Sequence, residues 1–521
     1  RSTLFPYTTL FRSIIENYMN DKWNSKVGFL MAAIGSAVGL GNLWRFPYVA
    51  ASNGGGAFLL PYLFAILTAG IPILILEYTI GKNYRDGAPA ALARINKKFE
   101  WLGWLQVGIS FMILIYYFAI VVWTLCYVVY SFNQGWGADP TTFFVKDFLG
   151  MTASAHELGG IRTNLIIPFL AVWGITAFVM YRGISKGIEK ICRIGLPILI
   201  GFTLVLVIRG LTLSGATDGL QYMFKPDWTA LGKAKVWIAA YGQIFYSLSI
   251  AFGIMISYSS YLPKETDVVN SAFITATANH GFELFAGIGI FSIMGFMAME
   301  QGVQVADIAK QGVGLAFMVF PKAISTLPAM NSLIGVCFFG ALFVAGITSL
   351  ISISEVVITG IQGKFRISSH SRAVTLVLIP SFLLSIFFIT GGGLSILDIL
   401  DAFVNNVGLA FSGILELILL MWFCKPERFR QMANEYSNFS VGKWWTYSLK
   451  IITITLLGIM AVLNTYQFIT KGYGDPPYSS LDVGLFGWGS LAIVLIIIIV
   501  FIKAKGYEGY NNLYGLPEKV V

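Results

Sequence analysis

The chain has 521 residues, of which 56% are hydrophobic and only 12% are charged. Soluble domains usually carry about twice that charged fraction, so a water-soluble globular protein is excluded, as are disordered and collagen-like chains. The four cysteines lie in or beside apolar runs without any CxxC pair, which favours simple packing over a disulfide scaffold or metal site. Because the apolar residues fall in long runs, we expect an integral membrane protein with many spans.

The first residues of the chain fit no span. Residues 1–13 read RSTLFPYTTLFRS, which has neither the plan of a signal peptide nor helical periodicity. We therefore interpret residues 1–18 as a non-native or disordered tail and take Met19 as the expected native start. Residues 22–505 are predicted to form a single polytopic domain, followed by a cytoplasmic tail over 506–521.

Twelve apolar segments reach the ~20 residues that a helix needs to cross a bilayer, so the predicted fold is all-α with twelve transmembrane helices. The predicted spans are about 27–50, 56–80, 102–131, 163–181, 191–209, 237–260, 270–297, 332–360, 373–390, 394–423, 446–468 and 482–503. The segment 298–331 is too polar to span and predicts a hairpin folded back on the protein.

The positive charges indicate the orientation. Loops on the side of the N-terminus hold most of the 35 lysines and arginines, which predicts that both termini are cytoplasmic in a multi-pass protein of the plasma (inner) membrane. The same bias accounts for the net charge of +9, so we expect no nucleic-acid partner.

Two predicted spans contain an interruption. Residues 35–42 read GSAVGLGN in the first span, and residues 247–253 read SLSIAFG in the sixth. Close helix packing by small residues is the alternative for either cluster alone. The first and sixth spans each begin a set of five spans, however. This placement is typical of inverted-repeat transporters, whose paired broken helices form the binding site. We expect repeats over about 27–209 and 237–423, with extra helices over about 446–503.

Neutral oxygen donors gather at the depth of these interruptions. Asn42, Ser247, Asn279, Thr348 and Ser349 lie within predicted spans. An all-oxygen, uncharged donor set suits a hard cation, and Na⁺ fits better than Ca²⁺ or Mg²⁺ because no carboxylate is included. For each hydroxyl, a hydrogen bond to its own helix is the alternative.

Ionisable groups within spans are functional candidates because burying them is costly. Arg45 follows the first interruption and Asp401 lies in the tenth span, and we expect them to meet outside the binding site. Glu77, Glu283 and Glu416 are further carboxyl groups in apolar helices; each could instead be a neutral or backbone-paired glutamate.

Several motifs together resemble the neurotransmitter:sodium symporter family, and its bacterial amino-acid (LeuT-type) members most, over about residues 22–505. They are GSAVGLGNLWRFPYVAASNGGGAFLLPY at 35–62, IYY at 115–117, RGISKGIEK at 182–190, WIAAYGQIFYSLSIAFG at 237–253, SYSSY at 257–261, AGITS at 345–349 and LDILD at 397–401. The resemblance implies a LeuT-type 5+5 inverted repeat with broken helices 1 and 6, plus two C-terminal helices.

The resemblance also implies the ligands of two sodium ions and an amino acid. The first sodium site would use Ala37, Asn42, Ser247 and Asn279, and the second would use Gly35, Val38, Ala345, Thr348 and Ser349. The substrate would contact Ala37, Leu40, Gly41, Tyr117, Tyr246, Ser247 and Ser249, with Ile113, Tyr246, Phe252, Ser349 and Ile353 around its side chain. Arg45 and Asp401 would form the outer gate.

The chain departs from the family pattern at several positions. Ser247 replaces the usual threonine, and Ala251 replaces a frequent glycine, so that its methyl group is expected to narrow the pocket. The inner gate pair is absent, because its positions hold Asn20 and Gly363. Either Lys22 serves instead, or packing around Trp23 and Tyr261 seals the inner side.

The predicted function is sodium-coupled symport of a neutral α-amino acid, with small to medium aliphatic side chains favoured, by alternating access. Chloride-dependent relatives have a serine at the position of Glu283, so we expect this carboxylate to replace chloride, with proton counter-transport as a consequence. The alternatives are an aromatic amino acid as substrate or, in another class, a cation channel. A membrane-embedded enzyme is disfavoured because HExxH and a His/Asp cluster are absent from the sequence, whose three histidines lie in different regions. The amino acid carried and the oligomeric state stay open.

Overall fold

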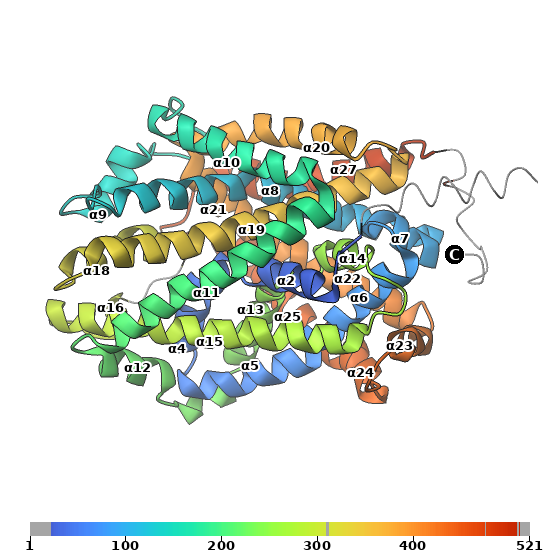
Figure 1. Cartoon of the computed structure of the whole chain (residues 1–521), viewed down its shortest axis with the longest axis horizontal. Helices are drawn as coiled ribbons and strands as arrows, with labels where there is room; N and C mark the ends of the chain where they lie inside the picture. The colour runs from blue at the N-terminus through green and yellow to red at the C-terminus, as the bar shows by residue number, and fades with distance from the viewer. Residues whose placement is uncertain (1–21, 309–311, 475, 508–509, 511–521) are drawn as a thin grey trace, which may run out of the picture.

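The computed structural model describes residues 22–308, 312–474, 476–507 and 510. This part of the chain is helical, and its strand pairings are three isolated bridges. Most of the long helices run along one common axis, which is horizontal in Figure 1. The predicted all-α class is therefore confirmed for the described residues. The predicted tail over 1–18, Asn20 and most of the predicted tail over 506–521 lie outside them.

Ten helices in the described residues are long and apolar enough to cross a membrane, and each overlaps one predicted span. They are Gly56–Tyr84, Lys97–Tyr130, Thr163–Tyr181, Ile184–Leu211, Val268–Gln301, Asn331–Phe365, His370–Ile389, Gly393–Trp422, Lys443–Lys471 and Ser480–Lys503. The longer labelled helices within them are α6 (Ile71–Tyr84), α8 (Glu100–Tyr130), α10 (Thr163–Tyr181), α11 (Glu189–Leu211), α15 (Val268–Gln301), α19 (Asn331–Phe365), α20 (His370–Ser385), α21 (Gly393–Phe403), α22 (Ala410–Trp422), α25 (Ile454–Lys471) and α27 (Gly489–Lys503).

The first predicted span is broken, as its sequence indicates. Helix α2 (Lys26–Ala37) ends before Val38, and a second segment runs through α3 (Leu40–Trp44) and α4 (Phe46–Ser52) at an angle of 50° to the first. The break is narrower than the predicted 35–42, because α2 continues through Gly35. At the break, the side-chain oxygen of Asn42 accepts a hydrogen bond from the Gly39 amide at 2.8 Å. A local side chain thus replaces the helical hydrogen bond that is lost there.

The sixth predicted span is broken as well. Helix α13 (Ala234–Ser247) and helix α14 (Ile254–Ser259) are separated by residues 248–253. Ser249, Ala251 and Gly253 have φ values of 52°, 64° and 80° in this segment. Such values are uncommon for residues other than glycine, so surrounding contacts must hold the segment in place. Neither half is long enough to span alone, and the topology of twelve spans therefore stays a prediction.

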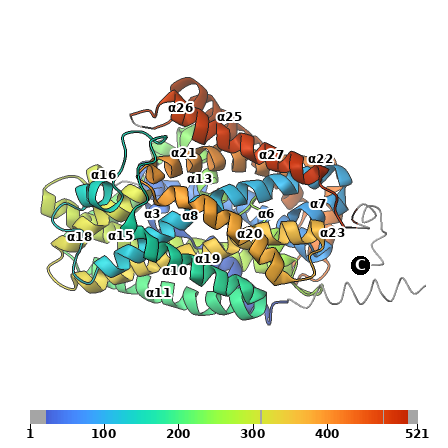
Figure 2. The same cartoon turned by 90° about the horizontal axis from the view of Figure 1, so that it is seen from above.

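The centre of the bundle is formed by α8 and α19, which pack against each other. The most apolar stretches of their spans are 78% and 83% buried within the protein, against 33% and 22% for the spans that contain α25 and α27. Figure 2 shows α25 and α27 on one flank of the bundle and α10 and α11 on the opposite flank. The last two spans are therefore peripheral, with most of their apolar surface available to lipid.

The segment 298–331 folds back against the protein. It contains α16 (Val305–Ile308) and a short apolar helix over Gly312–Thr326. Phe317 stacks on Phe144 with ring centroids 5.2 Å apart, and Phe320 stacks on Phe338 at 4.0 Å. The described part of this segment therefore agrees with the predicted hairpin.

Close packing of α8 on α7 (Ala88–Ile95) gives a test of this arrangement. A Cβ added at Gly103 would lie 2.3 Å from the Pro89 Cα, whereas nothing lies within 4 Å of a Cβ added at Gly174 in α10. We expect Gly103→Ala to lower the melting temperature of the purified protein. Gly174→Ala should leave it unchanged or raise it, because alanine is favoured over glycine in helices by ~1 kcal/mol. Equal melting temperatures for the two variants would contradict the packing described.

Candidate functional site

The two helix breaks contact each other in the interior of the bundle. The Ser249 hydroxyl, between α13 and α14, donates to the carbonyl of Ser36 in the last turn of α2 at 3.1 Å. The Ser349 hydroxyl of α19 lies 3.4 Å from the same carbonyl oxygen. All three residues are buried. The end of α2, the segment 248–253 and the middle of α19 therefore meet at one place.

Three polar side chains from different helices cluster beside this contact. The Asn42 amide nitrogen donates to Asn279 Oδ1 of α15 at 2.9 Å and lies 3.4 Å from Ser247 Oγ at the end of α13. The Asn279 amide nitrogen also donates to Ser247 Oγ. All three are buried. The side chains predicted for the first sodium site are thus brought together, although they are up to 237 residues apart in sequence.

The residues predicted for the second site lie where α2 and α19 touch. A Cβ added at Gly35 would lie 3.8 Å from Thr348 Cβ. The Thr348 hydroxyl lies 3.0 Å from the Val344 carbonyl and 3.1 Å from the Ala345 carbonyl of its own helix. A hydrogen bond to these carbonyls uses the hydroxyl hydrogen of Thr348 and leaves lone pairs on its oxygen for a cation. In both sites the expected donors are backbone carbonyls and the side chains of asparagine, serine or threonine, which carry no charge.

The space beside Gly39 is bordered by two predicted substrate residues. A Cβ added at Gly39 would lie 3.0 Å from Ser349 Oγ and 3.9 Å from the hydroxyl oxygen of Tyr117 in α8. The Tyr117 hydroxyl also interacts with the backbone of Leu40 at the start of α3. The structure therefore brings together Gly39, Leu40, Tyr117 and Ser349.

The predicted pocket residues Ile113, Phe252 and Ile353 are all buried. Ala251 packs against α22, where a Cβ added at Gly413 would lie 3.3 Å from its methyl group. The expectation that this methyl group narrows the pocket stays a prediction. The conformation of the backbone at 248–253 turns the residue to that side, which spacing along the sequence does not reveal.

Glu283 lies directly beside the polar cluster. Its Oε1 accepts hydrogen bonds from Ser247 Oγ at 2.7 Å and from the Gln243 amide at 2.8 Å. Its Oε2 lies 3.2 Å from His280 Nδ1, which is 2.5 Å from the Tyr62 hydroxyl. Sequence analysis missed the roles of Gln243, His280 and Tyr62. The spacing of four residues between Gln243 and Ser247 could have indicated the first of them, because residues four apart share a helix face.

The two residues predicted as the outer gate lie close to the site without pairing. The Arg45 guanidinium carbon is 3.7 Å from the centroid of the Tyr246 ring. Asp401 accepts hydrogen bonds from the Tyr116 hydroxyl at 2.6 Å and from the Asn405 amide at 2.7 Å. No ion pair joins Arg45 to Asp401 in the described part of the chain. Their role as a gate stays a prediction.

The opposite side of the site is closed by packing around Trp23. This side chain is buried, and its indole nitrogen donates to the Tyr258 carbonyl at 2.8 Å. The Tyr261 hydroxyl donates to Glu355 Oε1 at 2.7 Å, whereas Lys22 is exposed. Of the two alternatives for the inner seal, the structure therefore favours packing around Trp23 and Tyr261.

At Gly363, the other position of the missing inner-gate pair, a Cβ would lie 2.3 Å from Asp86 Oδ1. A longer side chain at this position would therefore have to displace Asp86, which pairs with Arg94 at 2.8 Å.

Comparison with known proteins agrees with this geometry. The model of the sodium:neurotransmitter symporter family matches residues 20–139 and 137–507 of the chain. The chain belongs to this family. It is therefore a sodium-dependent, multi-pass membrane transporter and not an enzyme, and membership implies the LeuT fold for its helices.

Relatives of this symporter come from archaea and animals. An uncharacterized sodium-dependent transporter of Methanocaldococcus jannaschii is 38% identical over 495 residues, covering 95% of this chain and 100% of the relative. A sodium-dependent dopamine transporter of Bos taurus is 31% identical, covering 93% of this chain and 74% of the relative. A sodium- and chloride-dependent taurine transporter of Rattus norvegicus is 28% identical, covering 93% and 85%. The similarity thus extends over almost the whole symporter, while the named substrates differ.

The contact that Glu77 makes with the second break gives a prediction. Glu77 Oε1 of α6 accepts a hydrogen bond from the Ala251 amide at 2.6 Å, and Glu77 is fully buried. In Glu77→Ala the amide loses its partner, which costs ~1–3 kcal/mol. We expect a lower melting temperature for this variant and near-normal stability for Glu77→Gln, which keeps a carbonyl acceptor. An equal loss in both variants would mean that the charge, rather than the acceptor, is needed.

Proposed function

We propose that this symporter couples the uptake of a neutral α-amino acid to the inward movement of sodium by alternating access. The observation that carries the proposal is the buried, uncharged cluster of Asn42, Ser247 and Asn279 beside two broken helices. Such a cluster offers several oxygens to a cation and holds no fixed positive charge that would repel one. The carbonyls of Ala37 and Ser247 and the carboxylate of the substrate complete this first sodium site.

The second sodium ion binds between α2 and α19. Its ligands are the carbonyls of Gly35, Val38 and Ala345 with the hydroxyls of Thr348 and Ser349. The contact of Gly35 with Thr348 supports this assignment. An ion that bridges α2 and α19 stabilises the arrangement in which the two helices touch, so its release favours their separation.

The amino acid lies between the two breaks with its charged ends at opposite helix termini. Exposed N–H groups at the start of a helical segment favour a carboxylate, so Leu40 and Gly41 with the Tyr117 hydroxyl receive that end. Exposed carbonyls at the end of a segment favour a cation. The ammonium group is therefore received by the carbonyls of Ala37, Tyr246 and Ser247 and by the Ser249 hydroxyl.

The substrate class follows from Gly39. A side chain there would approach Ser349 and Tyr117, so an acidic residue would fill the space where a substrate carboxylate belongs. With glycine, the negative charge that completes the first sodium site comes from the substrate. Amino acids should therefore bind, and the amines formed from them by decarboxylation should not. Buried Ile113, Ile353 and Phe252 favour small to medium aliphatic side chains.

Alternating access requires each side of the site to open in turn. On the outer side, the mobile elements would be Arg45, which stacks on Tyr246, and Asp401. On the side that the charge distribution predicts to be cytoplasmic, Trp23 must leave its contact with Tyr258. Both helix breaks lie between these two layers and allow one half of a span to move without the other.

Sodium dependence provides the main test. Because the substrate carboxylate completes the first ion site, the two affinities must be coupled reciprocally. In a binding screen of the amino acids with purified protein, replacing sodium by choline should weaken binding by about tenfold, or ~1.4 kcal/mol. Asn42→Ala and Thr348→Ala should each lower the apparent sodium affinity. Binding that is unchanged without sodium, or seen for decarboxylated amines alone, would refute the proposal.

Transport is proposed to need no chloride, because Glu283 supplies the negative charge. Two sodium ions and a zwitterion leave a net positive charge in a medium of low dielectric constant, which is costly without an anion nearby. The Glu283 carboxyl group contacts Ser247 directly, within the first sodium site. The glutamate would lose a proton when sodium binds and regain one on the return step, which gives proton counter-transport.

Uptake into liposomes with gluconate in place of chloride tests this role. The wild type should remain active, and Glu283→Ser should regain activity only when chloride is added, because the smaller side chain leaves room for the anion. Gln243→Ala, which removes a neighbour of the carboxyl group while keeping its charge, is the matched control and should stay independent of chloride. A wild type that requires chloride would overturn the proposal.

A further inference from the structure

A basic pocket lies at one end of the bundle, away from the helix breaks. It has a volume of about 400 Å³ and is formed where α8 begins and where α19 and α27 end. Its lining includes five lysines and one acidic residue: Lys97, Lys98, Lys364, Lys503, Lys505 and Glu100. Charge distribution predicts this end to be cytoplasmic.

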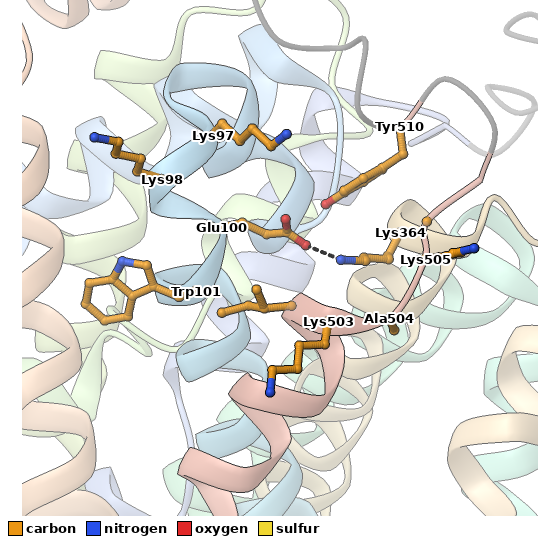
Figure 3. A pocket seen from close by; sticks show the side chains of 11 residues that line it. Lys97, Lys98, Glu100, Trp101, Lys364, Lys503, Ala504, Lys505 and Tyr510 are labelled. Atoms are coloured by element: carbon orange, nitrogen blue, oxygen red, sulfur yellow. Dashed lines mark hydrogen bonds and ion pairs between the residues drawn. The ribbon is translucent and has the colours of Figure 1, made fainter.

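The acidic residue is already neutralised. Lys364 Nζ lies 2.6 Å from Glu100 Oε1, and both side chains are largely buried. Figure 3 shows this pair at the centre of the pocket, with Lys97, Lys98, Lys503 and Lys505 around it. The latter four lysines are exposed and carry long, flexible side chains. The pocket thus has an excess of positive charge that the acidic residue in its lining does not balance.

The pocket continues into a surface that suits hydrocarbon. Helix α27 has most of its side chains exposed, and Ile496, Ile499 and Val500 on the turns before the pocket are each more than half exposed. Ile502 and Trp101 belong to the lining itself. Tryptophan is enriched at the level of lipid headgroups, where its ring is apolar and its N–H is polar. A lipid whose acyl chains lie along α27 would therefore have its headgroup at the lysines of the pocket.

We propose that this pocket binds the phosphate of an anionic phospholipid headgroup, while the acyl chains lie along the apolar surface of α27. Basic pockets between transmembrane helices on the cytoplasmic side are suited to such headgroups, because charge attraction and apolar contact act together. A free phosphate ion would satisfy the lysines but not the apolar surface. The lipid would bridge the peripheral α27 and the central α8 and α19.

Native mass spectrometry of the purified, full-length transporter tests this site with phosphatidylglycerol, phosphatidylcholine and inorganic phosphate as probes. Phosphatidylglycerol should bind much more tightly than phosphatidylcholine. Lys98→Gln combined with Lys503→Gln should weaken phosphatidylglycerol binding by roughly tenfold, since each removes one charge from the pocket. The matched control, Lys425→Gln with Lys443→Gln, removes two exposed lysines on the same predicted side and should bind as the wild type does.

A charge-conserving variant separates electrostatics from damage to the fold. Lys98→Arg with Lys503→Arg should keep the affinity for phosphatidylglycerol, and a loss there would contradict the proposal. Equal losses in the pocket and control variants would show general surface attraction and overturn the site. Displacement of the lipid by inorganic phosphate at equal concentration would show a small-anion site and overturn the assignment to a lipid.

Discussion

Backbone groups in the interior of a bilayer must find partners within the protein, because lipid offers none. The two helix breaks of this symporter expose such groups, and side chains of other helices satisfy them. Glu77 accepts from the Ala251 amide, and Ser412 of α22 donates to the Ala251 carbonyl at 3.0 Å. Ser110 of α8 donates to the Phe252 carbonyl at 2.9 Å. Three helices thus hold the non-helical segment 248–253 in place, and the arrangement of the site depends on them.

The same constraint generates a site that is ready to bind ions. Ser249 and Ser349 both approach the Ser36 carbonyl, so the end of α2 is linked to both α19 and the second break. Hydrogen bonds of this kind fix the positions of carbonyl and hydroxyl oxygens while leaving lone pairs available. A donor set that is positioned before the ion arrives loses little conformational entropy on binding. The hydrogen bonds that stabilise the two helix breaks therefore also position the oxygens that are proposed to bind sodium.

The bundle separates the central site from its surroundings in the membrane. Helices α8 and α19 are mostly buried; both contact residues at the helix breaks, and both line the basic pocket at one of their ends. Helix α27 is mostly exposed and, of these two places, lines only the basic pocket. Substrate would therefore act on the middle, and lipid on one end, of the same two central helices. Such a shared element is the physical basis on which lipid composition could influence the equilibrium between transporter states.

Features that depend on short stretches of sequence were predicted well. The span at 163–181 coincides with the helix Thr163–Tyr181, because the length of an apolar run reflects the thickness of the bilayer. The break before Leu40 was placed within a few residues, because clustered glycines weaken a helix locally. The resemblance in sequence motifs correctly placed Asn42 and Asn279 in one cluster, which spacing alone would not have done.

Features that depend on the direction of a side chain were decided by the tertiary structure. The methyl group of Ala251 packs against Gly413 of α22, and Arg45 stacks on Tyr246 rather than pairing with Asp401. The neighbours of Glu283 include His280 one turn away and Gln243 forty residues away on another helix. The sequence by itself determined which residues are apolar, which segments can cross the membrane as helices and where those helices break, because these features follow from local composition. It did not determine which side chains face one another, because that depends on how separate helices are rotated and packed.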